Sequence, residues 1–104
     1  MEQTERIQLM EQMLDKAAAA VDELSAALDR YDQAREAIRT LDEYYGSEAW
    51  KDDFRADEEG LLPAGLKRGV LSEDAAWNVL ADNRELTVRL LETAAQTLRD
   101  RNGL

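Results

Sequence analysis

A chain of 104 residues is long enough for one small domain with a modest core. Its 13 Lys and Arg against 23 Asp and Glu give a net charge of -10, which opposes binding to nucleic-acid phosphates or to an anionic membrane surface. Because Cys and His are both absent, the chain lacks the residues of ordinary zinc sites and of Ser-His or Cys-His nucleophile pairs.

Residues 3 to 45 are predicted to form one long amphipathic helix. The spacing follows heptads as far as Tyr31, and the next step of three then shifts the apolar stripe, as a discontinuity in a coiled coil would. Gly46 offers a natural stop, because glycine readily adopts the backbone conformation that ends many helices. The apolar positions recur every three or four residues, at Ile7, Met10, Leu14, Ala17, Val21, Leu24, Leu28, Tyr31, Ala34, Ile38, Leu41 and Tyr45.

A shorter helix is expected next, with Ser47 as its N-cap and Gly60 just past its end. Trp50 and Phe54 are four residues apart, so they share one face of this helix. The aromatic side chains near it are expected to pack into the core, because large aromatics dominate small cores. This aromatic set comprises Tyr44, Tyr45, Trp50, Phe54 and Trp77.

Residues 60 to 74, GLLPAGLKRGVLSED, form a connector in which Gly65 and Gly69 are expected to take backbone angles that other residues resist. Ser72 is the predicted cap of the last helix, which ends before Asn102 and Gly103. The connector carries too much apolar surface to be left in water, so we expect it to pack onto the helices through Leu61, Leu62, Leu66, Val70 and Leu71.

Four segments resemble a family of small bacterial proteins catalogued as domain of unknown function 4298. They are the opening RIQLMEQML, YYGSEAW at 44–50, ADEEG at 56–60 and LPAGLKRGVLSED at 62–74, of which LKRGVLSED is the most specific. The similarity covers nearly the whole chain. It implies a small, helical, bacterial protein, and it assigns no activity or catalytic residue to any position.

The segment GLLPAGLKR is similar to a phosphate-binding loop but fails its requirements. Leu66 separates Gly65 from Lys67, Arg68 stands where the motif needs Ser or Thr, and no strand precedes the segment to present the loop. We therefore interpret it as a structural turn.

Acidic side chains offer two further hypotheses. Asp29 with Asp32, and Asp82 with Glu85, are spaced to share a helix face and could hold a cation, but with 23 acids in the chain such pairs are expected by chance, and a solvated face is favoured. The acidic run at 52–59 is expected to meet Lys67 and Arg68 when the connector folds back, although exposed pairs stabilise little.

The predicted fold is all-α, with a single domain over residues 1–104. Two long helices form an antiparallel hairpin, and the short helix and the packed Gly/Pro connector lie across one end. The acidic, polar start and the lack of a membrane-length apolar run predict a cytoplasmic protein with no membrane anchor. The first helix is longer than the last, so a homodimer through the long helices is expected.

For function, the sequence favours a non-enzymatic protein-interaction or regulatory module without a cofactor. The alternative is a magnesium-dependent enzyme that acts on a phosphorylated small molecule through helix-borne carboxylates, with Lys67 and Arg68 contacting phosphate. Lys67 and Arg68 are the two connector residues to which the sequence assigns no structural role. The predicted partner surface comprises Trp50, Phe54, Pro63, Leu66, Lys67 and Arg68.

Overall fold

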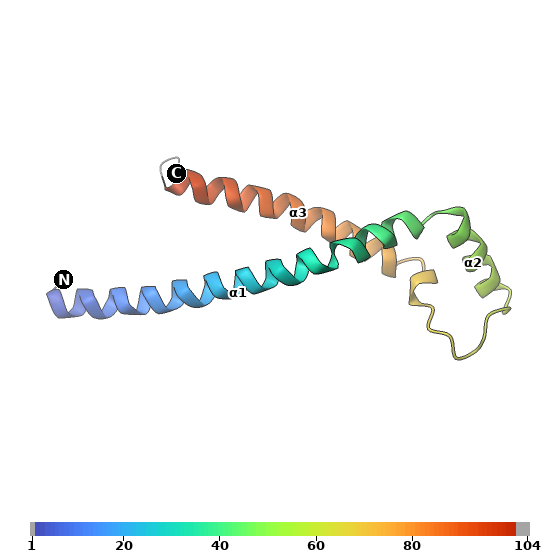
Figure 1. The fold of residues 1–104 in the computed structure, drawn as a ribbon, viewed down its shortest axis with the longest axis horizontal. Helices are drawn as coiled ribbons and strands as arrows, with labels where there is room; N and C mark the ends of the chain where they lie inside the picture. Colours follow the sequence, from blue (N-terminus) through green and yellow to red (C-terminus); the bar gives the residue numbers. More distant parts are fainter. Residues whose placement is uncertain (1, 102–104) are drawn as a thin grey trace. The chain divides into compact units, whose positions relative to one another are not determined.

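The computed structural model describes residues 2–101, and these form helices joined by turns, with no strand in that range (Figure 1). The predicted all-α fold is confirmed, with a long first helix, a short second helix, the Gly/Pro connector and a long last helix. The elements are α1 at Gln3–Tyr44, α2 at Glu48–Glu58, the 3₁₀ turn η1 at Gly69–Leu71, and α3 at Ala75–Asp100.

The chain divides into two compact units. The first ends at Ala37 and the second begins at Ile38, so α1 contributes to both. In the described part of the chain the first unit consists of Glu2 and α1 up to Ala37, while the second contains the end of α1 and all of α2, η1 and α3. The single domain over 1–104 stays a prediction.

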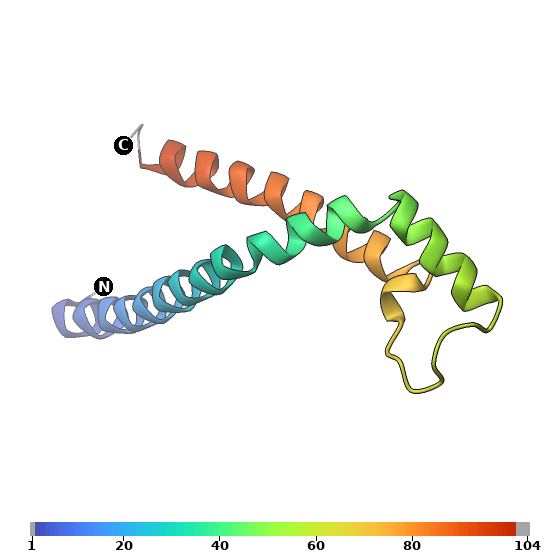
Figure 2. The ribbon, with the colours of Figure 1, turned by 45° about the vertical axis from the view of Figure 1, so that its right-hand side comes forward.

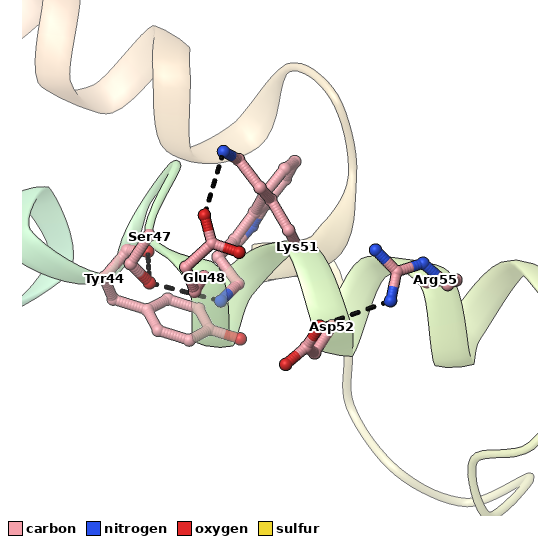
Figure 3. Close-up of polar contacts among 7 residues, drawn as sticks. Tyr44, Ser47, Glu48, Lys51, Asp52 and Arg55 are labelled. Atoms are coloured by element: carbon pink, nitrogen blue, oxygen red, sulfur yellow. Dashed lines mark hydrogen bonds and ion pairs between the residues drawn. The ribbon is translucent and has the colours of Figure 1, made fainter.

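The turn between α1 and α2 follows the sequence prediction closely. Gly46 has a φ of 81°, a left-handed conformation that glycine adopts at little cost. Ser47 is the N-cap of α2: its Oγ accepts a hydrogen bond from the backbone N of Trp50 at 3.2 Å and donates one to the carbonyl of Tyr44 at 2.6 Å (Figure 3). One hydroxyl thus joins the end of α1 to the start of α2.

The end of α2 is a Schellman motif. The backbone N of Gly60 donates to the carbonyl of Asp57 at 3.1 Å, and that of Leu61 to the carbonyl of Ala56 at 3.0 Å. Gly60 has a φ of 70°, which confirms its predicted role. The same expectation is wrong for Gly65 and Gly69, because neither has a positive φ and the chain turns there through ordinary backbone conformations.

The start of α3 differs from the prediction by two residues. Ser72 is not the helix N-cap, because the helix begins at Ala75 and Asp74 precedes it. The Ser72 hydroxyl nevertheless accepts a hydrogen bond from the backbone N of Ala75 at 3.1 Å and donates one to the carbonyl of Gly69 at 2.8 Å. Ser72 also ends η1, and this second role moves the helix start downstream. Asn102 and Gly103 lie outside the described residues.

The second unit has a small core. Among the described residues only Leu71 and Ala76 are buried, at 5% and 3% exposure. Beside them the ring of Trp50 contacts the ring of Tyr45 edge-on and stacks on that of Phe54, with centroid distances of 5.1 Å in both pairs. These three aromatic side chains are half-buried.

Two packing expectations need correction. Trp77 was expected in the core, but it is 58% exposed. The connector packs only in part, because Leu71 is buried and Leu62 half-buried, while the remaining apolar side chains of the connector are exposed. Neighbouring side chains of a 3₁₀ turn point about 120° apart, so η1 buries Leu71 and leaves Val70 exposed. Of the five apolar side chains expected to pack, the exposed ones are Leu61, Leu66 and Val70.

Candidate functional site

The connector forms a pocket with the end of α1 and one face of α2, entirely within the second unit. Figure 2 shows the connector as the loop between the end of α2 and η1. The pocket has a volume of about 250 Å³. We call its lining the connector surface, which comprises Tyr44, Asp53, Leu62, Leu66, Lys67, Arg68, Val70 and Leu71.

Trp50 attaches η1 to α2. Its indole Nε1 donates a hydrogen bond to the carbonyl oxygen of Val70 at 3.0 Å. The Ser47 cap begins α2 three residues earlier, so the position of the indole along the helix follows from the cap. Trp50 therefore holds η1 to α2 and is not among the residues that line the pocket.

An ion pair also joins the connector to α2. Nη1 of Arg68 lies 2.9 Å from Oδ1 of Asp57, with side-chain exposures of 35% and 31%. This pair confirms that the basic connector meets the acidic run of α2. It also corrects the view that Arg68 has no structural role, because the pair joins residues eleven apart in sequence.

Lys67 differs from its neighbour. Its side chain is exposed, it lines the pocket, and no described residue forms an ion pair with it. The connector surface therefore presents one ammonium group that has no ion-pair partner among the described residues.

Tyr44 and Asp53 form the helical side of the pocket. The Tyr44 hydroxyl donates a hydrogen bond to Oδ2 of Asp53 at 2.5 Å. This hydrogen bond raises the pKa of Tyr44 to about 12, with smaller contributions from partial burial and from the negative charge of Asp53. The hydroxyl therefore stays a donor to more alkaline pH than an ordinary tyrosine would, and the Asp53 carboxylate is engaged within the chain.

The structure brings together half of the predicted partner surface. Leu66, Lys67 and Arg68 line the pocket. Pro63 is exposed but lies outside the lining, and the half-buried Trp50 and Phe54 stack on each other and do not line the pocket.

Sequence reasoning missed Tyr44 and Asp53 as members of the site. They are nine residues apart on two helices, and no helical or strand periodicity pairs side chains at that separation. The only available signal was the helix stop predicted at Gly46 and the cap predicted at Ser47, which place a turn between the two residues.

The acid pairs lie as the solvated-face interpretation predicts. Asp29, Asp32, Asp82 and Glu85 are all exposed, and Asp32 is 3.6 Å from the guanidinium of Arg35. Across residues 2–101 no group of three or more acidic side chains is placed to hold a metal ion. The same described residues include no helix with the length and hydrophobicity needed to cross a bilayer.

Comparison of the chain with curated proteins and with solved structures gave no match. A family model described as domain of unknown function DUF4298 matches residues 7–93, a range that includes both the heptad stripe and the connector. This match confirms the resemblance seen in the sequence, and the chain belongs to the DUF4298 family.

Proposed function

We propose that this protein is a non-enzymatic interaction module whose connector surface binds a partner protein. The observation that carries the proposal is the pocket at the connector, where Leu66, 49% exposed, and the unpaired Lys67 lie side by side in sequence. An exposed apolar side chain offers a partner apolar surface to cover, and an adjacent unpaired charge orients an oppositely charged group of that partner.

The charges around the pocket indicate the chemistry of the partner. Asp53 accepts the hydrogen bond of Tyr44 and Asp57 pairs with Arg68, so the acidic groups near the pocket are already engaged. Lys67 is the group left to attract an opposite charge. The matching ligand is a protein segment that inserts an apolar side chain next to Leu66 and places a carboxylate near Lys67.

The connector is prepared for binding by contacts made within the chain. The Trp50 indole, the Arg68–Asp57 pair and the Schellman motif at Gly60 restrain the connector at three points. A segment that is already ordered loses less conformational entropy on association than a flexible loop. The restraints therefore favour a binding surface over a passive linker.

The enzymatic alternative has no comparable support. A magnesium-dependent reaction on a phosphorylated substrate requires several carboxylates around one point, and the described residues contain no such group. The chain has no cysteine, which suits a reducing compartment, so we expect the partner protein to be cytoplasmic.

Affinity capture with matched lysine variants tests the proposal. The chain has three lysines, Lys16, Lys51 and Lys67, so Lys16→Glu changes the charge by the same amount as Lys67→Glu but in the first unit. We expect a specific partner on the wild type and on Lys16→Glu that is absent from Lys67→Glu and from Leu66→Ser. Equal capture by all four proteins, each with unchanged helical circular dichroism, would contradict the proposal.

A further inference from the structure

The heptad stripe of α1 lies in the first unit, away in sequence from the connector. It starts at Ile7 and its regular spacing ends at Tyr31, before the unit boundary at Ala37. No side chain of α1 is buried, and Val21 and Leu14 are 66% and 60% exposed. Such a row of exposed apolar side chains is characteristic of a surface that another chain covers.

The positions along this stripe match a two-stranded coiled coil. Alternate steps of three and four over more than three heptads are the spacing of a and d positions. β-branched Ile7 and Val21 stand at two of the four a positions and Leu24 at one of the four d positions, and β-branched residues at a with Leu at d favour two parallel strands. We call these residues the heptad seam: Ile7, Leu14, Val21 and Leu28 at a, and Met10, Ala17, Leu24 and Tyr31 at d.

We propose that the heptad seam pairs with the same seam of a second copy of this chain, as a parallel, in-register coiled coil. The charges that flank the seam favour a second copy of the chain as the partner and a parallel orientation of the two helices. In a parallel pair each g residue faces the e residue five positions later on the other helix, and Arg6 at g then faces Glu11 at e of the second copy. Because the dimer is twofold symmetric, it contains two such Arg6–Glu11 pairs.

The opposite direction lacks this complementarity. In an antiparallel pair e positions face e positions and g positions face g positions. Both charged e residues, Glu11 and Asp32, are acidic, so any alignment in which two charged e residues face each other brings two carboxylates together. Arg6 then faces only apolar g residues. Of the other flanking positions, Met13 at g is long and apolar, and the remaining four are small and let the helices approach closely; these four are Ala18, Ala20, Ser25 and Ala27.

Because the chain contains no cysteine, a single introduced thiol reports which residues meet. Met10→Cys stands at a d position near one end of the seam, and Gln12→Cys stands at the outward-facing f position as its matched control. In the parallel dimer Met10→Cys oxidises to a covalent dimer and Gln12→Cys does not. A mixture of Met10→Cys and Leu28→Cys gives no covalent heterodimer between positions 10 and 28.

Charge exchange tests the pair that sets the direction. Arg6→Glu places two acids opposite each other and is expected to raise the dimer dissociation constant about tenfold, whereas Arg6→Glu with Glu11→Arg restores it. Within one helix these residues are five apart and do not face each other, so rescue by the double variant reports a contact between chains.

Three results would overturn the inference. A sedimentation mass of one 11.8 kDa chain at micromolar concentration excludes the dimer. The last helix of the same chain is then the alternative partner of the heptad seam. Crosslinking between positions 10 and 28 replaces the parallel pair with an antiparallel one. Equal dissociation constants for the wild type, Arg6→Glu and the double variant remove the role of Arg6 and Glu11.

Discussion

The hydroxyl of Tyr44 donates a hydrogen bond of 2.5 Å to the carboxylate of Asp53, and so connects the last residue of α1 to the middle of α2. The two residues also line the pocket at the connector. This contact and the Ser47 cap together hold the turn at Gly46, on which the connector surface depends.

Replacing Tyr44 by Phe removes the hydroxyl and leaves the ring. We expect the free energy of unfolding to fall by about 1 kcal/mol, which is less than a buried bond to a charged group contributes, because water reaches the site. Urea denaturation measures the change. Tyr45→Phe is the matched control, since its hydroxyl lies 3.5 Å from the carbonyl of Glu73, a long contact whose loss is expected to cost less. Equal effects of the two variants would contradict the assignment.

The raised pKa of Tyr44 predicts a loss of stability at high pH. The folded state holds the phenolic proton up to a pKa of about 12, whereas the unfolded chain releases it near 10. The folded state therefore binds this proton more tightly, so the contribution is complete below about pH 10 and is lost as the pH rises through about 12. The difference in unfolding free energy between the wild type and Tyr44→Phe should shrink over that window. A difference that is constant with pH would exclude the hydrogen bond.

The Arg68–Asp57 pair is expected to stabilise the connector more than a surface pair does. A double-mutant cycle with Arg68→Gln and Asp57→Asn should give a coupling of about 1 kcal/mol, because both groups are about two-thirds buried and 2.9 Å apart. The control cycle is Arg55→Gln with Asp52→Asn, an exposed pair at 3.3 Å.

The control pair is expected to couple by only about 0.3 kcal/mol and to lose that coupling in high salt. If the two cycles give the same coupling energy at low salt, the Arg68–Asp57 pair has no special role in the connector.

Substitution by alanine should change the stability of the protein differently at two glycines of the connector. Gly60 has a φ of 70° and Gly65 lacks a positive φ, and an added Cβ meets no atom within 4 Å at either position. Only backbone conformation distinguishes them. Gly60→Ala is expected to destabilise the protein by about 1 kcal/mol, and Gly65→Ala to be neutral or to stabilise by up to about 1 kcal/mol. Thermal unfolding measures both, and a destabilised Gly65→Ala would contradict the described turn.

The features that the sequence predicted well are local. The stop at Gly46, the Ser47 cap and the Gly60 motif each depend on the conformational preference or the hydrogen-bonding group of one residue. The stacking of Trp50 on Phe54 likewise follows from helical spacing. Such features require no knowledge of how distant elements pack.

The features that it missed depend on tertiary geometry. Ser72 was expected to begin α3, but the η1 turn uses its backbone and shifts the helix start to Ala75. Trp77 was placed in the core because of its size, yet its direction on α3 leaves it 58% exposed. Charge alone suggested that Lys67 and Arg68 meet the acidic run, but only the folded connector shows that Arg68 is paired with Asp57 and Lys67 is not.

The most direct test of the connector as a binding surface is the affinity of the captured partner, measured by calorimetric titration. The proposal predicts that Lys67→Glu weakens binding at least about tenfold, with the free energy of unfolding unchanged because Lys67 makes no ion pair with a described residue. Lys16→Glu should bind like the wild type. Wild-type affinity in a variant that combines Leu66→Ser with Lys67→Glu would contradict the account.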